Sequence, residues 1–390
     1  MIENGRIAEV LTNWKPLSAP CEEVIDATGC YLLPGIIDDH VHFRDPGLTH
    51  KADILTESRA AAAGGVTSIM DMPNTNPLTV TLDALNAKFD LLNEKCIVNH
   101  SCYFGATNDN YTEFDKLDKH RVCGIKLFMG SSTGNMLVDK MNSLLKIFNG
   151  TDMLIAAHCE DQETIKANIE KYRQKYKGAD DIPVNAHPGI RSVPACYASS
   201  ELAVRLARIA GARLHILHVS TAKELQLFSD EPLEDKNITS EACVAHLLFT
   251  LAHYNSLGAR VKCNPAVKRK TDREALRAAV NSGLIDVIAT DHAPHLLSEK
   301  EGGALKAMSG MPMIQFSLVS MLGLVDEGVF SLETVVQKMC HAPARIYGIC
   351  QRGYIREGYQ ADLVLVRPDS PWEVTADKIL SKCGWSPLEG

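Results

Sequence analysis

The sequence contains no Cys-x-x-Cys pair, although it has 12 cysteines. Zinc ribbons need closely spaced cysteine pairs, and disulfide scaffolds concentrate their cysteines in a short chain. Here the cysteines are scattered singly over 390 residues, which excludes both classes. We expect them to be reduced and to act mostly as small, buried apolar residues.

The chain also lacks a long apolar run and a basic stripe, and we expect no leader at its N-terminus. No stretch is long and apolar enough to cross a bilayer, and the N-terminus has no basic region followed by an apolar core. The formal net charge is −8, which favours solubility. These absences predict a cytoplasmic protein whose partners include neither a membrane nor nucleic acid.

Short apolar segments alternate with longer helical patterns, and this alternation predicts parallel βα units. Eight strand candidates in this order favour a closed (β/α)8 TIM barrel, an α/β fold, over an open doubly wound sheet. The strand candidates are residues 35–42, 67–72, 98–105, 124–129, 153–158, 213–219, 237–242 and 286–291. The helical patterns between them include residues 54–63, 82–92, 162–176, 195–210 and 273–281.

The barrel does not use the whole chain. Residues 5–10, 24–28, 353–358 and 361–366 form short strand-like pieces with turn residues between them. We predict a small β-sandwich domain formed by both termini, residues 1–34 and 347–390. The barrel, residues 35–346, is inserted between them as the catalytic domain.

Two histidines, His40 and His42, close the first strand candidate. Side chains two residues apart on a strand point to the same side, so both imidazoles can reach one metal ion. The carboxyl end of a strand is also where parallel α/β folds place their chemistry. Taken alone, the pair fits equally well with two unrelated surface or core histidines.

Other residues that can bind metal recur at the ends of later strands. His158 and His218 each end an apolar strand, and Asp291 follows one, where a carboxylate can bind metal and exchange a proton with substrate. Alternation places His215 and His218 on opposite faces, so we expect only His218, nearer the strand end, to point into the barrel. Taken singly, each histidine fits a hydrogen-bonded core residue, and Asp291 fits a helix N-cap.

Lys126 lies in the strongly apolar segment 124–129, where an unpaired ammonium group is costly to bury. Its amine is therefore paired, extended to solvent or modified. A deprotonated lysine reacts with carbon dioxide to give a carbamate, whose two oxygens can bridge two divalent ions. Imidazole, carboxylate and carbamate together suit zinc or a similar ion, and two such ions can hold a bridging hydroxide. The combined set predicts a hydrolytic site.

Six motifs carry these residues in chain order: Asp39-His-Val-His-Phe-Arg-Asp-Pro-Gly47, Met70-Asp-Met-Pro-Asn-Thr-Asn-Pro77, Gly124-Ile-Lys-Leu-Phe128, Ala157-His-Cys-Glu160, Leu217-His-Val-Ser-Thr221 and Ala289-Thr-Asp-His-Ala-Pro-His295. Together they resemble the motifs of the amidohydrolase superfamily and, within it, of the dihydroorotases. The resemblance covers essentially the whole chain. It implies a (β/α)8 barrel, a β-sandwich built from both termini, and two Zn²⁺ ions per subunit, although other divalent ions could replace zinc.

The resemblance also assigns roles to residues. The two zinc ions would be bridged by carboxylated Lys126, and their ligands would be His40, His42, Lys126, His158, His218 and Asp291. Arg44 would form a bidentate pair with a substrate carboxylate, a task that suits the guanidinium group. The residues that would help to hold this carboxylate or the ring amides are Asn74, Asn264 and His295.

The implied reaction is the reversible cyclisation of N-carbamoyl-L-aspartate to L-dihydroorotate in pyrimidine biosynthesis. Asp291 would be the catalytic residue that moves the proton between the nucleophile and the ring nitrogen. The resemblance implies no redox or organic cofactor, and the family suggests a homodimer.

Two other functions stay open. An allantoinase or a hydantoinase/dihydropyrimidinase acts on a neutral ring, and residues 302–313, expected to form the loop over the substrate, resemble that branch in their Gly310-Met-Pro312 turn. A non-catalytic scaffold subunit is disfavoured because every implied metal position is filled. Family members usually begin before Met1 and continue past Gly390. We therefore expect a truncated chain with an incomplete small β-domain.

Overall fold

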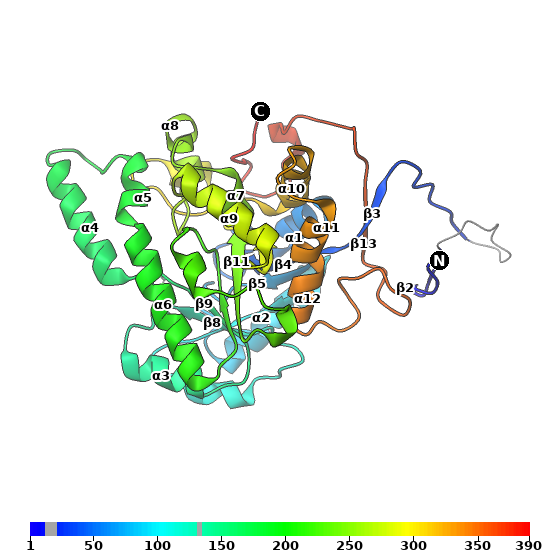
Figure 1. Ribbon diagram of the computed structural model, residues 1–390, viewed down its shortest axis with the longest axis horizontal. Helices are drawn as coiled ribbons and strands as arrows, with labels where there is room; N and C mark the ends of the chain where they lie inside the picture. Colours follow the sequence, from blue (N-terminus) through cyan, green and yellow to red (C-terminus); the bar gives the residue numbers. More distant parts are fainter. Residues whose placement is uncertain (12–21, 131–134) are drawn as a thin grey trace.

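Parallel strands form the centre of the molecule, with helices packed around them (Figure 1). The computed structural model describes residues 1–11, 22–130 and 135–390. All eight predicted strand segments are present, the third as two short strands separated by Tyr103. The strands are β4 (Ile36–Val41), β5 (Val66–Asp71), β6 (Asn99–Cys102), β7 (Phe104–Gly105), β8 (Ile125–Phe128), β9 (Ile155–His158), β10 (Leu214–Ile216), β11 (Ile238–Cys243) and β12 (Val287–Ala289).

Backbone pairing follows the order of the chain. One parallel ladder joins β4, β5 and β6, and a second joins β7, β8, β9, β10, β11 and β12. His42 N donates to His292 O at 2.8 Å, and His292 N donates to His40 O at 3.3 Å. The end of the first strand in the series therefore lies beside the segment that follows the last.

Helices connect the strands, and several begin at side-chain caps. Asp53 Oδ1 accepts a hydrogen bond from Thr56 N at the start of α1 (Ile54–Ala63). Asp161 Oδ1 accepts one from Thr164 N at the start of α4 (Gln162–Lys175). Such caps satisfy amides that have no partner inside the helix.

All five predicted helical patterns form helices. These are α1 (Ile54–Ala63), α2 (Leu82–Lys95), α4 (Gln162–Lys175), α6 (Val193–Ala210) and α9 (Lys270–Ser282). The helices that the sequence analysis did not name are α3 (Met141–Asn149), α5 (His187–Ile190), α7 (Val244–Leu248), α8 (His253–Leu257), α10 (Ser317–Asp326), α11 (Leu332–Val336) and α12 (Ala342–Ile346).

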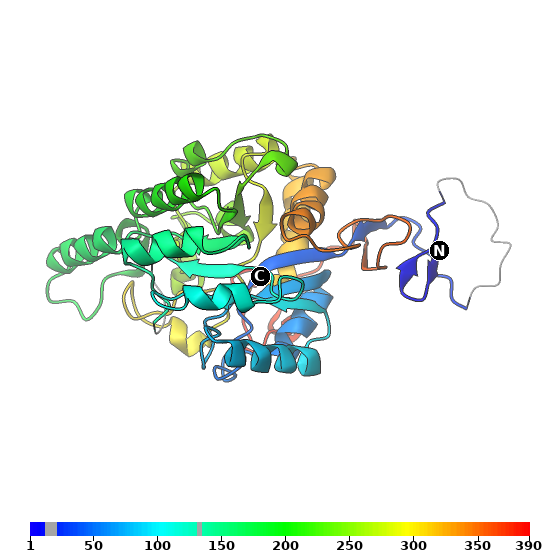
Figure 2. The ribbon, with the colours of Figure 1, turned by 90° about the horizontal axis from the view of Figure 1, so that it is seen from below.

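The two ends of the chain meet in small antiparallel sheets. Strand β3 (Tyr31–Pro34) pairs with β13 (Leu363–Val366), and β1 (Ile2–Glu3) pairs with β2 (Arg6–Ile7). Figure 2 shows this region extending away from the main body. The predicted association of the termini is thus present as an antiparallel β3–β13 pair. Residues 12–21 of the predicted 1–34 segment lie outside the described residues.

The last residues of the chain return to the main body. Trp385 is buried, and its Nε1 donates to His295 O at 2.7 Å. Lys382 N donates to Glu57 Oε1 at 3.0 Å, and Glu57 Oε2 lies 2.7 Å from His292 Nε2. The C-terminal segment therefore contacts the loop that carries Asp291 and His295.

Buried apolar side chains form four clusters among the described residues. A large cluster joins strands to helices through residues such as Ile69 and Phe104, and a smaller one includes Ile37, Met70 and Tyr103. Within the residues described, no helix is long and apolar enough to cross a membrane. Fully buried charged and imidazole groups accompany the apolar core, and their burial is costly unless they are paired. They include Asp39, Lys126, His215 and Glu241.

Candidate active site

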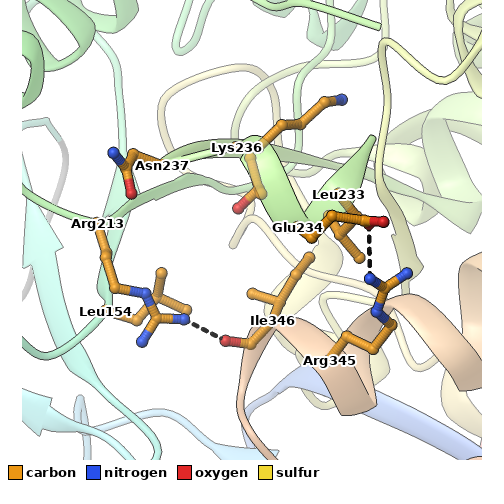
Figure 3. Close-up of a pocket in the computed structure, with 9 residues that line it drawn as sticks. Leu154, Arg213, Leu233, Glu234, Lys236, Asn237, Arg345 and Ile346 are labelled. Carbon is orange, nitrogen blue, oxygen red and sulfur yellow. Dashed lines mark hydrogen bonds and ion pairs between the residues drawn. The ribbon is translucent and has the colours of Figure 1, made fainter. Parts of the chain in front are cut away.

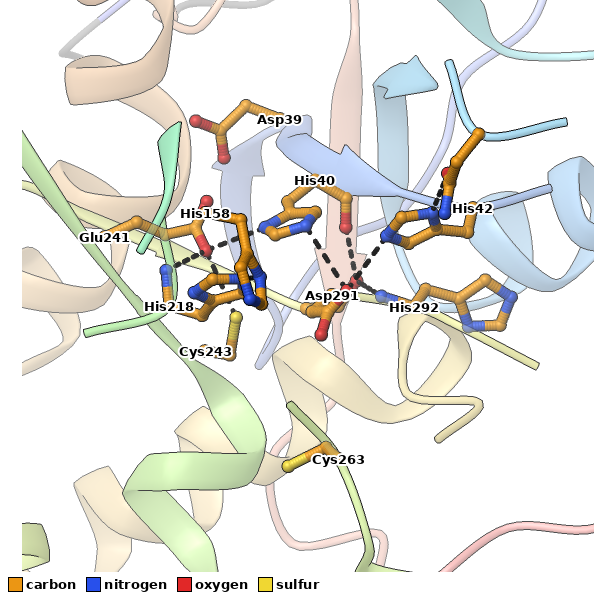
Figure 4. A network of polar contacts seen from close by, with 12 residues as sticks. Asp39, His40, His42, His158, His218, Glu241, Cys243, Cys263, Asp291 and His292 are labelled. Atoms are coloured by element: carbon orange, nitrogen blue, oxygen red, sulfur yellow. Dashed lines mark hydrogen bonds and ion pairs between the residues drawn. The ribbon is translucent and has the colours of Figure 1, made fainter. Parts of the chain in front are cut away.

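Two histidines and an aspartate meet where β4 and β12 end (Figure 4). Asp291 Oδ1 lies 3.3 Å from His40 Nε2 and 3.1 Å from His42 Nε2. Asp291 has φ of 48°, a left-handed conformation that is uncommon outside glycine and often marks functional sites. The three ligating atoms lie within 4.8 Å of one another, close enough to share one metal ion.

The other ring nitrogen of each histidine contacts a side-chain oxygen. His40 Nδ1 is 2.9 Å from Glu241 Oε1, and His42 Nδ1 is 2.7 Å from Asn74 Oδ1. Because these oxygens accept hydrogen bonds, each Nδ1 carries the proton and each Nε2 keeps a free lone pair. Burial lowers the pKa of both histidines well below the usual value, so the rings are neutral, as metal ligands must be.

A second histidine pair lies at the ends of β9 and β10. His158 Nδ1 is 2.9 Å from His218 Nε2. His158 Nε2 contacts Glu160 Oε2 at 3.0 Å, and Glu160 forms an ion pair with Arg191. Burial alone would raise the pKa of Glu160, but Arg191 and His158 outweigh it and lower the pKa to about 2. The carboxylate therefore fixes the His158 proton on Nε2 and leaves Nδ1 facing His218.

Lys126 is buried on β8, with Nζ 4.6 Å from the centre of the Phe128 ring. Burial lowers the pKa of this amine to about 8, while Asp291 and Glu241 act in the opposite direction. A lysine with this pKa exists partly as the neutral amine near neutral pH. The neutral amine is the form that reacts with carbon dioxide.

Arg44 and His295 lie together beside the cluster of His40, His42 and Asp291. Arg44 Nε donates to Pro294 O at 3.1 Å, and Arg44 Nη2 is 3.1 Å from His295 Nε2. Arg44 has φ of 65°, so the chain turns sharply two residues after His42. The predicted neighbours Arg44 and His295 are therefore in contact, although 251 positions separate them in the sequence.

The two predicted asparagines have protein partners in this structure. Asn74 contacts His42 through Oδ1, as described above. Asn264 Oδ1 is 3.1 Å from His187 Nε2, which also lies 2.9 Å from Cys263 O. Asn74 thus lies beside a predicted metal ligand, whereas Asn264 is positioned through His187.

Part of the predicted substrate loop, residues 302–313, packs against His295. Ala293 N donates to Met311 O at 2.9 Å. Gly310 has φ of 143°, and a Cβ at this position would lie 2.4 Å from Ala293 O and 3.0 Å from His295 Cδ2. Only glycine therefore fits at this turn without displacing its neighbours.

The alternation assumed for His215 and His218 was wrong. Strand β10 ends at Ile216, and His218 has φ of 39°, which breaks the strand geometry. His218 N donates to Glu241 Oε1 at 2.9 Å, while His215 Nε2 is 3.9 Å from Glu241 Oε2. The His218 ring lies 5.2 Å from the His40 ring, and His215 Nε2 lies 3.4 Å from Asp39 Oδ2, so both side chains face β4.

Glu241 is the central residue that the sequence analysis did not select. It lies on β11, is fully buried, and contacts His40, the backbone of His218 and, at 3.2 Å, Cys243 Sγ. Burial and the nearby Asp39 raise the pKa of Glu241 to about 8. Its signal in the sequence is a single carboxylate in the otherwise uncharged segment 238–243.

A surface cleft of about 400 Å³ lies elsewhere in the molecule (Figure 3). Leu154, Arg213 and Asn237 in its lining each immediately precede β9, β10 or β11. The cleft therefore opens at the amino ends of these strands, opposite the histidine clusters. In α/β barrels this face contributes to stability rather than to chemistry.

Known proteins resemble this chain along its whole length. Residues 31–381 match the amidohydrolase family. The chain belongs to this family. Among curated members, it is 33% identical to a dihydroorotase of Halobacterium salinarum, covering 100% of this chain and 91% of the relative. It is also 33% identical to a dihydroorotase of Methanosarcina acetivorans, over 100% of this chain and 84% of the relative. The resemblance of the six motifs to amidohydrolases of the dihydroorotase kind is confirmed.

Solved amidohydrolase structures share the fold. An L-hydantoinase (dihydropyrimidinase) from Arthrobacter aurescens superposes with a TM-score of 0.93 at 29% identity, over 100% of this chain and 87% of the other. A dihydropyrimidinase from Brevibacillus agri gives a TM-score of 0.88 at 23% identity, over 100% and 86%. The chain is thus a cyclic-amidohydrolase-like α/β protein with buried groups suited to metal binding.

Proposed function

We propose that this protein is a dihydroorotase, which interconverts N-carbamoyl-L-aspartate and L-dihydroorotate. The observation that carries the proposal is the contact of Arg44 with His295 beside the His40–His42–Asp291 cluster. A guanidinium at this position matches a substrate with a carboxylate next to the reacting ring. Full-length relatives named dihydroorotase, at 33% identity, support the same substrate.

We further propose that the site holds two zinc ions. His40, His42, carboxylated Lys126 and Asp291 would hold one, and Lys126, His158 and His218 the other. The donor set fits, because three of the four histidines have their other ring nitrogen on an oxygen, which leaves a lone pair for metal. A carbamate on Lys126 would also remove the cost of burying an ammonium group. When bound, the ions would supply a hydroxide nucleophile and polarise the carbonyl under attack.

The residues of the chain then perform three tasks. Arg44 pairs with the substrate carboxylate and orients the ring. Asp291 lies beside His40 and His42, and its side chain is 14% exposed. It would accept the proton of the nucleophile and deliver it to the leaving ring nitrogen. In the cyclising direction the same carboxylate accepts the proton of the ureido nitrogen. The loop containing Gly310 packs against the ring of His295.

A hydantoinase or dihydropyrimidinase activity is the second candidate. It is favoured by the TM-score of 0.93 with the Arthrobacter L-hydantoinase. Such an enzyme acts on a ring without a carboxylate, so Arg44 would have no anionic partner. The two candidates therefore differ in what Arg44 binds.

The assay that separates them uses zinc-supplemented protein with dihydroorotate, allantoin, hydantoin and dihydrouracil side by side. Turnover of dihydroorotate alone, or far faster than the others, supports the proposal. Turnover of a neutral ring without dihydroorotate would reject it in favour of the second candidate. Bound zinc without any turnover would favour a scaffold subunit.

We also propose the architecture in which this chemistry takes place. The backbone hydrogen bonds of His292 with His42 and His40 support closure of the strands into a (β/α)8 barrel, residues 35–346. Residues 1–34 and 347–390 would form the small β-domain, and the protein would act as a homodimer. Light scattering of the purified protein tests the assembly.

A further inference from the structure

Lys51 is a buried cation that the proposed mechanism does not use. It lies in the loop between β4 and α1, seven residues after Arg44, and only 8% of its side chain is exposed. Its Nζ is 3.1 Å from His295 Nδ1 and 2.8 Å from Glu299 Oε1. His295 therefore has a cationic side chain at each ring nitrogen, Lys51 at Nδ1 and Arg44 at Nε2.

The His295 ring also has a backbone partner, because it hydrogen-bonds to the backbone carbonyl of Ser309. Ammonium and guanidinium groups only donate hydrogen bonds, and a neutral imidazole has one acceptor nitrogen. Burial, with Arg44 and Lys51 close by, lowers the pKa of His295, so the ring is neutral. One nitrogen therefore accepts a hydrogen bond from the neighbouring cation, and the other carries the ring proton, for which the backbone carbonyl of Ser309 is an acceptor.

Each cation lies 3.1 Å from its ring nitrogen, so the other partners of Nδ1 indicate which nitrogen accepts. Glu299 Oε2 is the acceptor that could take a proton from His295 Nδ1, but it lies 3.5 Å away, beyond a good hydrogen bond. Lys51 Nζ is nearer to the same nitrogen, at 3.1 Å. Nδ1 thus accepts from Lys51, and the ring proton is on Nε2, directed toward Arg44.

We propose that Lys51 is a positioning residue that holds His295 with its proton on Nε2, so that Arg44 and His295 together form a two-donor receptor for the substrate carboxylate. This inference rests on the proposed function. A carboxylate between the two donors would accept a hydrogen bond from each of them. Glu299 offsets the charge of Lys51, so the cluster of Arg44, Lys51 and Glu299 keeps one net positive charge, which matches one carboxylate.

Steady-state kinetics of the zinc-loaded protein with dihydroorotate test whether Lys51 affects binding of the substrate carboxylate. Lys51→Met should raise KM about tenfold and change kcat less than about threefold, because carboxylate binding and not proton transfer is weakened. Lys51→Arg keeps a donor and should restore KM to within about threefold of the parent. Lys95→Met is the matched control, since Lys95 pairs with Asp45 at 2.9 Å beside Arg44 but its bonds do not involve His295.

An equal KM in Lys51→Met and Lys95→Met would overturn the proposal, as would a loss confined to kcat. A structural readout is independent of turnover. In ¹⁵N-histidine-labelled protein, the His295 signal is the one that disappears in His295→Gln. In the parent this signal should report a ring with its proton on Nε2. In Lys51→Met it should shift toward the form with the proton on Nδ1. An Nδ1–H form in the parent, or no change on substitution, would overturn the proposal. Failure to turn over dihydroorotate while the NMR result holds would reject only the assigned substrate.

Discussion

A buried ion pair holds the backbone between His42, a proposed metal ligand, and Arg44. Lys88 Nζ lies 2.7 Å from Asp71 Oδ2, and both side chains are almost completely buried. Asp71 Oδ1 also accepts a hydrogen bond of 2.8 Å from the amide of Phe43, the residue between His42 and Arg44. Replacing Lys88 would therefore leave an unpaired carboxylate under the site.

The expected cost of Lys88→Met follows from this geometry. Two unit charges 2.7 Å apart attract by about 6 kcal/mol at an effective dielectric constant of about 20. Desolvation of both groups offsets part of this gain, and breaking one side of a buried pair typically costs about 3–5 kcal/mol. We expect a loss of about 4 kcal/mol in the free energy of unfolding, measured by urea denaturation at fixed zinc concentration.

Two further variants make this measurement decisive. Lys166→Met removes an exposed ion pair of similar length, 2.9 Å to Glu163, and should leave the free energy of unfolding nearly unchanged because solvent screens the pair. The double variant Lys88→Met/Asp71→Asn keeps an acceptor for Phe43 N without a buried charge, and should recover much of the loss. The reasoning is refuted if Lys88→Met costs no more than Lys166→Met, or if the double variant is less stable than Lys88→Met.

Three other predictions follow from the same structure. Lys126→Ala should lose zinc and activity, with partial recovery by added short-chain carboxylic acids; unchanged zinc content by elemental analysis would reject the carbamate bridge. Arg44→Ala should keep the zinc content of the parent while KM for dihydroorotate rises at least about tenfold, and an unchanged KM would remove its role. Burial lowers the pKa of His246 to about 4, below its unfolded value of about 6.5. Because the buried ring is neutral, the contribution of His246 to folding stability is complete above about pH 6.5 and is lost as pH falls toward 4. At pH 5 the loss is about 2 kcal/mol relative to pH 8, and His246→Gln should lack this part of the slope in urea denaturation.

Local sequence patterns were sufficient to place most of the strands and the candidate metal ligands His40 and His42. An apolar run that ends in His40 and His42 specifies both a buried strand and the side on which the imidazoles lie, because the side-chain period of a strand is two residues. His158 follows from the same pattern. The position of Asp291 also followed from its strand, although its left-handed backbone did not.

Contacts between distant segments could not be read from those patterns. Glu241 and His40 are 201 positions apart, and Lys51 and His295 are 244 apart. Their contacts depend on how strands and loops converge in space. The interpretation of His215 failed for a local reason, since the strand ends at Ile216 and the period-two pattern no longer applies beyond it.

The distinction between dihydroorotase and hydantoinase depends on few residues. The metal-type side chains and the fold suit either activity, as the full-length likeness to both groups indicates. On the proposed function, Arg44 and His295 would carry the difference, because they would present hydrogen-bond donors to a carboxylate that only one of the two substrates has. Lys51 would strengthen that difference by fixing which nitrogen of His295 donates.

The ratio of kcat/KM for dihydroorotate to that for dihydrouracil, measured on the zinc-loaded parent and on Arg44→Ala, tests the central claim most directly. The account predicts a strong preference for dihydroorotate in the parent and a fall in this ratio of at least about tenfold in the variant. A parent that prefers dihydrouracil, or a ratio that Arg44→Ala leaves unchanged, would contradict it.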